Sequence, residues 1–451
     1  MRFGGGALAA AALGLSPLGQ LLAKAGSPMR AAHGYGPLNP VADLNTGLSL
    51  LELPEGFSYR TFGWAGELLS NGARTPGDHD GMGVVGQNGH VLTLVRNHEC
   101  LGDGPGFAPP GATYDPICDG GTTTLRFDAA SGEFLGADAS LSGTLRNCAG
   151  GITPWGSWLS CEEIVLAAGV HDWKGQQVML QREHGFVFEV PGDGVSDARP
   201  ILEMGQRRHE AAVVHEQSGA VFLTEDLAPQ SGFYRFTPKL PGALARGGRL
   251  EMLRAVGAAD LRRGLKSGQR WPVEWVPIDA PTQGIIDGQP NGNVSEGMAA
   301  GGSAFLRLEG CFADGDRILF VSTSGGDRGA GQVFVYHVDR AELQLIHEAT
   351  DPALLYYPDN IVASPRGGLL LCQDSYRDEP QPLYGLTADG GVFPLARNAV
   401  QLRGEQGFSG DFRKAEWAGA CFSPDGRWLF ANIYTPGFTV AITGPWREGL
   451  V

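Results

Sequence analysis

The sequence predicts an all-β protein, a six-bladed β-propeller with irregular insertions. Three observations lead to this prediction. Glycine (69 residues) and proline (29 residues) are spread over all 451 positions among short apolar runs, which is typical of many short strands joined by turns. Hydrophobic residues make up 42% of the chain, enough to bury a complete core. Finally, one pattern of turn, strand and acidic end recurs along the chain.

The recurring pattern is a turn containing glycine, then an apolar strand, then polar or acidic residues. It occurs in NGHVLTLVRNHE, WGSWLSCEE, SGAVFLTED, DGDRILFVSTSGGD, RGGLLLCQD and DGRWLFANI. In a propeller the innermost strands line a central channel, so equivalent strand ends from all blades meet at one mouth. The alternative is a β-sandwich or barrel whose polar strand ends face water.

The position of the acids within the pattern is shared between segments. Counted from the glycine of four segments, the sixth and seventh residues are Glu162-Glu163, Glu225-Asp226, Gln373-Asp374 and Asn432-Ile433. Between the segments, residues 246–263 have a helix-compatible pattern, and residues 283–303 form a connection rich in Gly and Asn. A connection of that length is usually functional or mobile.

Residues 1–25 are expected to be an export signal, and residues 26–451 a single propeller domain. Arg2 gives a charged start, an apolar segment follows, and Ala23-Lys24-Ala25 matches an A-x-A cleavage site. The segment resembles the end of a twin-arginine signal without the paired arginines; the alternative is a buried N-terminal helix. It is too short and Gly-rich to span a bilayer, so we expect export machinery as a partner and no transmembrane anchor.

Charge and cysteine content exclude several functions. The formal net charge is −15, and no basic block is present to neutralise phosphates, so we expect no nucleic-acid-binding surface. An acidic protein can still act on anions if bound cations invert the charge of the site. The seven cysteines form no CxxC pair, which argues against a zinc ribbon or a dense disulfide framework.

The acids at the strand ends predict a metal site. Each alone could be a solvated loop residue, but like charges that converge on one mouth are costly unless cations neutralise them. Calcium takes six to eight oxygen ligands, which such a cluster can supply. In the dipeptides His98-Glu99 and His209-Glu210 the glutamates are the better ligand candidates. The strand-end acids are Glu99, Glu162, Glu163, Glu225, Asp226 and Asp374.

Two further segments carry candidate chemistry. Cys148 lies in RNCAGGITPWG, where Gly150 and Gly151 allow a close backbone approach. A thiolate among carboxylates would select a transition metal such as iron over calcium, and the alternative is a buried structural thiol. Arg307 and Glu309 alternate on one strand, so both side chains point the same way. They could bind a phosphate or carboxylate, or simply form an ion pair.

Taken together, these segments resemble the PhoX-type alkaline phosphatases. The resemblance covers most of the chain and is carried by LPEGFSYRTFG, DHDGM, RNHE, GGTTTLRFD, RNCAGGITPWGSWLSCEE, HGFVFEV, RHEAA, TEDLAPQSGFYRF, RLEG, FVSTSGGDRGAGQVFVYH, PDNIVASPRGGLLLCQD, FSPDGRWLFANIYTPG and ITGPW. The chain departs from the family in its shorter length, in Gln373 where an acid is common, and in lacking the twin arginines.

The resemblance implies a six-bladed propeller that is periplasmic or secreted. It also implies hydrolysis of small phosphorylated substrates by a cluster of Ca²⁺ and Fe³⁺ ions bridged by an oxygen species. Cys148 would be the iron thiolate ligand, and Arg307 with Asn97 would bind the substrate, with Arg307 and Glu309 acting in catalysis. The remaining metal candidates are Glu99, Glu162, Glu163, Glu210, Glu225, Asp226, Glu309 and Asp374. We expect the protein to act as a monomer.

Two other functions stay open from the sequence. A calcium-dependent lactonase also uses acids at a propeller mouth, but it needs neither a thiolate nor a phosphate clamp. A non-catalytic propeller, stabilised by calcium, could bind a protein or a glycan at the same mouth.

Overall fold

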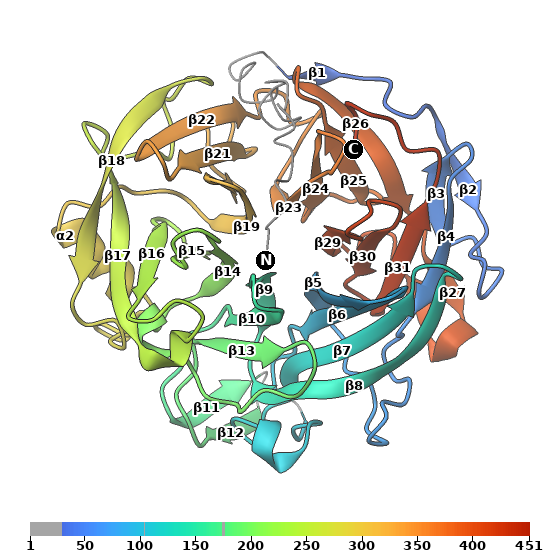
Figure 1. Ribbon diagram of the computed structural model, residues 1–451, viewed down its shortest axis with the longest axis horizontal. Helices are drawn as coiled ribbons and strands as arrows, with labels where there is room; N and C mark the ends of the chain where they lie inside the picture. The colour runs from blue at the N-terminus through green and yellow to red at the C-terminus, as the bar shows by residue number, and fades with distance from the viewer. Residues whose placement is uncertain (1–28, 103, 174–175) are drawn as a thin grey trace, which may run out of the picture.

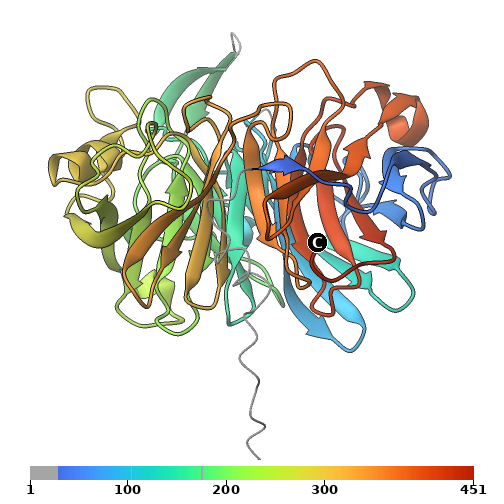
Figure 2. The same ribbon diagram turned by 90° about the horizontal axis from the view of Figure 1, so that it is seen from above.

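The computed structural model describes residues 29–102, 104–173 and 176–451, and these form a ring of six blades (Figure 1). The predicted propeller fold is confirmed. In the view turned by 90°, the strands at the centre of the ring run along its axis (Figure 2). The predicted export signal, residues 1–25, lies outside the described residues.

The first three blades follow one another along the chain, and each begins with its innermost strand. The first blade comprises β5 (His79–Asn88), β6 (Val91–His98), β7 (Gly120–Asp128) and β8 (Glu133–Thr144). The second comprises β9 (Asn147–Ile152), β10 (Ser157–Glu162) and β13 (Val187–Pro191), with an inserted hairpin of β11 (Gly169–Trp173) and β12 (Gln176–Leu180). The third comprises β14 (His209–Val214), β15 (Val221–Glu225), β16 (Tyr234–Pro238), β17 (Gly248–Ala255) and β18 (Arg270–Ile278).

The last three blades complete the ring. The fourth comprises β19 (Leu308–Asp314), β20 (Arg317–Ser322), β21 (Gln332–His337) and β22 (Glu342–Glu348). The fifth comprises β23 (Pro358–Ala363), β24 (Leu369–Gln373), β25 (Pro382–Leu386) and β26 (Gly391–Asn398), extended by β3 (Leu51–Pro54), β2 (Leu38–Val41) and β1 (Arg30–Ala31). The sixth comprises β29 (Trp417–Phe422), β30 (Leu429–Ile433), β31 (Phe438–Thr443) and β4 (Ser58–Phe62).

The ring closes through a strand from the early part of the chain. β4 pairs antiparallel with β31, so the sixth blade combines three late strands with one early strand. The innermost strands β5, β9, β14, β19, β23 and β29 each contact the next around a closed circle. Closure covers the blade faces that an open array would leave exposed, and each blade keeps short edge strands.

Apolar clusters join each blade to the next. Phe233 and Phe320, for example, stack at 4.2 Å between their ring centroids across the interface of the third and fourth blades. Phe127 of the first blade packs edge-on against Phe430 of the sixth. The other interfaces have buried clusters of the same kind, so the core is distributed around the ring rather than concentrated at its centre.

Among the described residues, the elements outside the six blades are few. The helix α2 (Gly292–Ala299) packs on β17 and β18 through Val294 and Met298. The remaining elements are the hairpin of β27 (Gln401–Arg403) and β28 (Ser409–Asp411) and the 3₁₀ turns η1 (Pro110–Ala112), η2 (Leu202–Met204), η3 (Leu244–Arg246) and η4 (Glu405–Gly407). No helix in these described ranges is long and apolar enough to cross a membrane.

Three sequence-based expectations are corrected by the fold. The recurring turn–strand–acid segment is the second strand of each blade rather than the innermost one. Residues 246–263 contain strand β17 instead of a helix, because β16 and β18 pair with it on both sides. Residues 283–303 include α2, which packs on the outer strands of the third blade.

The two glycines after Cys148 are required by close backbone approach, as their sequence suggests. A Cβ on Gly151 would lie 1.7 Å from the carbonyl oxygen of Ala212 on β14, the neighbouring innermost strand. A Cβ on Gly150 would lie 1.9 Å from the carbonyl oxygen of Leu159 on β10. The strand that carries Cys148 therefore packs at backbone distance from its neighbours.

We expect Gly151→Ala to lower the free energy of unfolding by about 1–3 kcal/mol, because the added methyl forces β9 and β14 apart. Thermal unfolding followed by circular dichroism measures this change. The matched control is Gly86→Ala on β5, where the nearest atom to the new Cβ is 3.8 Å away. Equal melting temperatures for the two variants would contradict the packing argument.

Candidate functional site

Every innermost strand carries a β-bulge near its start. On β5, His79 pairs with His98 and Met82 with Arg96, so Asp80 and Gly81 together face one residue of β6. The same two-against-one irregularity occurs in the other five blades. The first residues of the bulges are Asp80, Cys148, Glu210, Glu309, Asp359 and Gly419.

In the first five blades, the residue two positions before the bulge is also structurally equivalent. Its carbonyl oxygen accepts a hydrogen bond from the residue that follows the second strand, for example Arg146 from the Glu163 amide at 2.8 Å and Arg307 from the Thr323 amide at 3.0 Å. Arg146 (φ 46°) and Arg307 (φ 47°) adopt the left-handed conformation, which is strained for an arginine. This turn aims the bulge residue at the channel.

Three successive blades place an arginine at this equivalent position. Arg146, Arg208 and Arg307 come from the motifs RNC, RHE and RLE, each two residues before a bulge residue. Their side chains are 33%, 31% and 22% exposed, so all three are partly open to solvent at the mouth. The result is an arc of positive charge along one side of the opening.

Strand ends and bulges together line one cavity of about 620 Å³. Its walls carry nine carboxylic side chains, one thiol, three arginines and a lysine. These residues are Asp80, Glu99, Glu163, Glu210, Asp226, Glu309, Asp359, Asp374, Glu416, Cys148, Arg146, Arg208, Arg307 and Lys414.

Three groups within the cavity hold their acidic or thiol atoms close together. In each group one ligand-type atom per residue lies within 4.8 Å of the others. The groups are Glu99–Cys148–Glu163, Glu210–Glu309–Asp359 and Asp359–Asp374–Glu416. In addition, the Cys148 sulfur lies 3.3 Å from Oε1 of Glu210, which links the first group to the second.

Burial and mutual repulsion make these acids hard to ionise. Burial, and then the neighbouring carboxylates, raise the pKa of Glu210 and of Glu309 well above the usual range. Burial and the charge of Asp374 raise the pKa of Asp359 to about 8. Burial raises the pKa of the Cys148 thiol, as do Asp80 and Glu210. Negative charge in this cavity is therefore unfavourable unless cations are present.

The arginines offset only part of this charge. The Arg307 guanidinium donates to both carboxylate oxygens of Asp226 at 2.9 Å and to Glu309 at 2.9 Å. Nε of Arg146 donates to Glu99 at 2.8 Å, and its Nη2 lies 2.8 Å from Glu163. Burial lowers the pKa of both arginines, but the adjacent carboxylates outweigh burial and raise it above the ordinary value.

Most residues predicted from the sequence line this cavity. They are Cys148, Glu99, Glu163, Glu210, Asp226, Glu309, Asp374 and Arg307. In the two His-Glu dipeptides the glutamates face the cavity, whereas the histidine rings bond to backbone carbonyls elsewhere, His209 to Gly205 at 2.8 Å and His98 to Gly77 at 3.0 Å.

Two predicted ligands lie outside the cavity. Glu162 accepts hydrogen bonds from the amides of Leu145, Gly185 and Phe186 at 2.8–3.0 Å, and Glu225 accepts from Gly232 and from the Tyr234 hydroxyl. Successive residues of a strand point to opposite faces, so only one acid of each adjacent pair can reach the channel. The expectation that both members join the site is corrected by this alternation.

Asn97 is also not placed to contact a substrate. Its amide donates to the carbonyl oxygens of Cys148 and Ala149 at 2.9 and 2.7 Å and accepts from Trp158 and Ser160. The side chain is fully buried and its hydrogen-bonding capacity is used. Asn97 instead holds the bulge that presents Cys148.

Several residues that line the cavity have no strand-end signature in the sequence. Asp80, Asp359 and Glu416 lie at or just before the starts of first strands rather than at the ends of second strands. A signal was available in the short motifs DHDG, RNCA, RHEA, RLEG and YPDN, which share an acid or thiol before a small residue or asparagine. Glu416 lacks this motif, because its blade has Gly419 at the bulge.

The donor chemistry of the cavity fits bound cations. Clustered carboxylate oxygens suit hard cations such as calcium, and a thiol among them suits a transition metal. Without cations, nine carboxylic groups face only four basic side chains, so the residues present agree with the metal requirement of a polycarboxylate centre.

Fold and cavity together define a β-propeller with an acid-lined, arginine-rimmed central pocket. The sequence profile of the alkaline phosphatase PhoX family matches residues 33–135 and 120–437. Because these matches cover most of the chain, the protein belongs to the PhoX alkaline phosphatase family. No curated protein sequence matches this chain significantly.

Solved structures give weak similarities. The periplasmic gluconolactonase of Pseudomonas aeruginosa is 15% identical, with a TM-score of 0.33, over 80% of this chain and 78% of that one. The WD40 domain of Neurospora crassa Pan2 is 8% identical, with a TM-score of 0.34, over 83% and 91%. The PQQ domain of pyranose dehydrogenase from Coprinopsis cinerea is 9% identical, with a TM-score of 0.32, over 87% and 97%. The family assignment therefore depends on the sequence profile.

We expect cation-depleted protein to lose stability as pH rises from about 5 to about 8. The pKa values of Asp359 and Glu163 are raised to about 8 in the folded protein, mainly by burial, whereas free carboxyls titrate near about 4. The folded state thus binds more protons than the unfolded state across this window, and its advantage falls as they are released.

Melting temperatures measured in chelator across this range test the pH dependence. Excess calcium should prevent most of the decrease in melting temperature, because the cation neutralises the carboxylates that protons neutralise at lower pH. Chelated protein that is equally stable at both ends of the range would contradict the electrostatic account of the cavity.

Proposed function

We propose that this protein is a metal-dependent phosphatase that hydrolyses small phosphate esters at the propeller mouth, with Ca²⁺ and Fe³⁺ as cofactors. The observation that carries the proposal is the meeting of one thiol and nine carboxylic groups with an arc of three arginines in one cavity. Membership of an alkaline phosphatase family supports the same reaction.

The proposed ligands follow from the donor types. Glu99, Cys148 and Glu163 form the group that contains sulfur, so we assign the ferric centre to this side of the cavity. The two groups that share Asp359 contain only carboxylates, and we assign calcium to them. When bound, the cations would offset charge that builds up on the phosphoryl oxygens and activate the nucleophile.

The protein's own residues would bind and orient the ester. Arg307 presents a planar guanidinium with several N–H donors, which matches phosphate oxygens in a bidentate manner. Asp226 and Glu309 hold that guanidinium in place at 2.9 Å, and Glu309 thereby positions Arg307 as well as serving the metal site. Arg146 and Arg208 lie at the equivalent position of the two preceding blades and would attract the anionic substrate to the mouth.

The cellular setting forms part of the proposal. We infer export to the periplasm or beyond, with residues 1–25 as the signal and residues 26–451 as one catalytic propeller domain that acts as a monomer. Family membership and the A-x-A site in the sequence support this inference.

We expect Cys148→Ser to lower bound iron and the hydrolysis of p-nitrophenyl phosphate together, by about a hundredfold in kcat/KM, because serine is a poor ligand for iron. Elemental analysis and steady-state kinetics measure both quantities, and added chelator should abolish activity in the parent protein. Cys421→Ser is the matched control, since this partly exposed cysteine lies outside the cavity. Full iron content in Cys148→Ser would refute the ligand assignment.

We expect Arg307→Gln to lower kcat/KM for phosphate esters by about 10²–10³, because a donor to the reacting phosphoryl group is lost. Arg307→Lys should retain only part of the activity, since lysine keeps the positive charge but cannot bind the phosphate in a bidentate way. The control is Arg235→Gln, which removes a partly buried ion pair with Glu251 outside the cavity.

The same assays separate the alternative functions. Turnover of a lactone that exceeds phosphate ester turnover and is indifferent to Arg307→Gln would favour a lactonase. Stable, metal-loaded protein without hydrolysis of either substrate would favour a binding propeller.

A further inference from the structure

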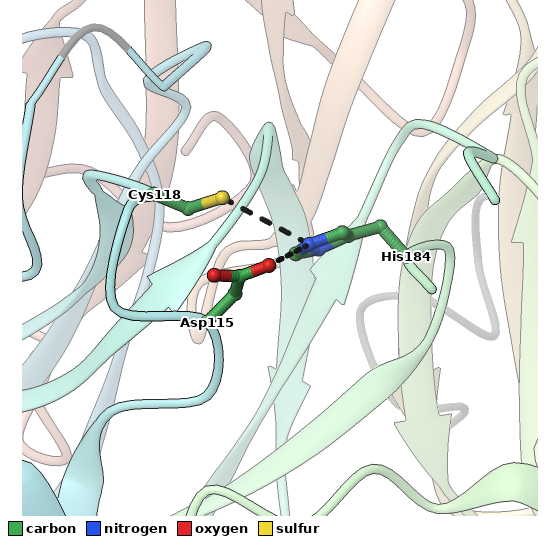
Figure 3. Close-up of side chains that lie close together, drawn as sticks. All are labelled: Asp115, Cys118 and His184. Carbon is green, nitrogen blue, oxygen red and sulfur yellow. Dashed lines mark hydrogen bonds and ion pairs between the residues drawn. The ribbon is translucent and has the colours of Figure 1, made fainter. Parts of the chain in front are cut away.

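A second cluster of ligand-type side chains lies outside the cavity, between the first and second blades. Figure 3 shows Asp115, Cys118 and His184 pointing toward one another, with the imidazole reaching between the sulfur and the carboxylate. All three side chains are fully buried, and one ligand-type atom of each lies within 4.8 Å of the other two. From this geometry we propose a separate structural site for a transition metal of the zinc type.

The spacing within the cluster suits ligands around a shared ion. Nε2 of His184 lies 3.7 Å from Oδ2 of Asp115 and 3.9 Å from Sγ of Cys118. The distance to the carboxylate is longer than an ordinary N–H···O hydrogen bond of about 2.9 Å. Tetrahedral zinc, with bonds of about 2.0–2.3 Å, separates its ligand atoms by about 3.3–3.6 Å. Shifts of a few tenths of an ångström would bring Nε2 to this spacing from both partners, and the three residues would supply three of the four positions of a tetrahedral ion.

Glu162 fixes the imidazole in the tautomer that a metal needs. Nδ1 of His184 lies 2.7 Å from Oε1 of Glu162, whose carboxylate also accepts three backbone amides. Burial lowers the pKa of His184, but Glu162, Asp115 and Cys118 outweigh it and raise that pKa to about 11, so a metal must displace the proton on Nε2. With Nδ1 still protonated toward Glu162, the lone pair of Nε2 then faces Asp115 and Cys118. Metal-binding histidines typically donate their other nitrogen to a carboxylate in this way. Glu162, which does not reach the cavity, would therefore orient the imidazole of His184 for metal binding.

Asp115 is held in place by the backbone. Its carboxylate accepts the amides of Gln181 at 2.7 Å, Arg182 at 3.1 Å and Ile117 at 3.4 Å. Gln181 and Arg182 donate to Oδ2 and Ile117 donates to Oδ1, so the carboxylate position that remains for a metal is on Oδ1. Oxygen, nitrogen and sulfur donors in one buried cluster are the combination that zinc and cobalt accept.

The site would fasten two long connections to each other. Asp115 and Cys118 lie between β6 and β7, whereas His184 lies between β12 and β13 of the next blade. Among the described residues, Cys118 belongs to a small satellite of the main core with Leu145 and Leu180. The partly buried residues packed against this satellite are Ile117, Ile164, Leu166, Trp173 and Val178. A metal would therefore stabilise a region that apolar packing alone secures poorly.

This region is connected to the cavity through the end of strand β10. Glu162 and Glu163 are adjacent at the end of β10 and point to opposite faces, so the zinc-type site and the cavity share one strand end. The site does not depend on the phosphatase proposal, since its ligands are different residues and its role is structural.

The test measures zinc and cobalt binding with the full chain. We expect about one equivalent of Zn²⁺ to remain after dialysis in the parent protein and in Cys148→Ser, and to be lost in Cys118→Ser. The Co²⁺-loaded protein should show a near-ultraviolet sulfur-to-cobalt charge-transfer band. Because Cys148 could give a similar band, the decisive sample is Cys148→Ser, which should keep the band, while Cys118→Ser with Cys148 blocked by alkylation should lose it.

A measurement without a Cys118 variant guards against loss of folding. In Cys148→Ser, Zn²⁺ should slow alkylation of Cys118, located by peptide mass spectrometry, in mild denaturant. The control residue is Cys161, which is equally buried on β10 but has no ligand partner in the cluster. Absence of retained zinc, a cobalt band that follows Cys148, or equal zinc protection of Cys118 and Cys161 would overturn the proposal.

Discussion

The main constraint on this structure is electrostatic: buried carboxylates that repel one another are held together at the axis of the ring. Each blade is a sheet of mainly antiparallel strands, and the apolar interfaces between blades hold the strand ends together. The bulges then turn acids and one thiol inward, where they repel one another. Apolar packing between the blades thus offsets the repulsion among the central carboxylates, and bound cations can reduce that repulsion.

The symmetry of the propeller explains how one small motif builds this centre. The motif consists of a turn residue, which is an arginine in three blades, one intervening residue and an inward-facing residue. The inward-facing residue differs in chemical type between successive blades. Where the inward residue is Cys148 the site gains a soft donor, and where it is Gly419 the blade uses Glu416 instead. Differences at equivalent positions therefore allow one repeated scaffold to offer several kinds of ligand.

Sequence reasoning predicted the propeller and most of the cavity because apolar strands with acidic ends have a local signature. It could not decide which member of an adjacent pair such as Glu162-Glu163 faces the channel, since that depends on register with β9 and β13. It also missed Asp80 and Asp359, whose positions depend on bulges that only strand pairing reveals. The role of Asn97 could not be predicted, because its backbone and side-chain partners all lie in the next blade.

The joint between β4 and β31 has a consequence for biogenesis. Glu416 and Tyr434 belong to the blade that this joint completes, and Tyr434 donates to Glu99 of the first blade at 2.7 Å. The pocket is consequently whole only after late-synthesised strands have met an early one. A nascent chain would expose an incomplete set of acidic residues, so the proposed metal ions would bind only after the ring has closed.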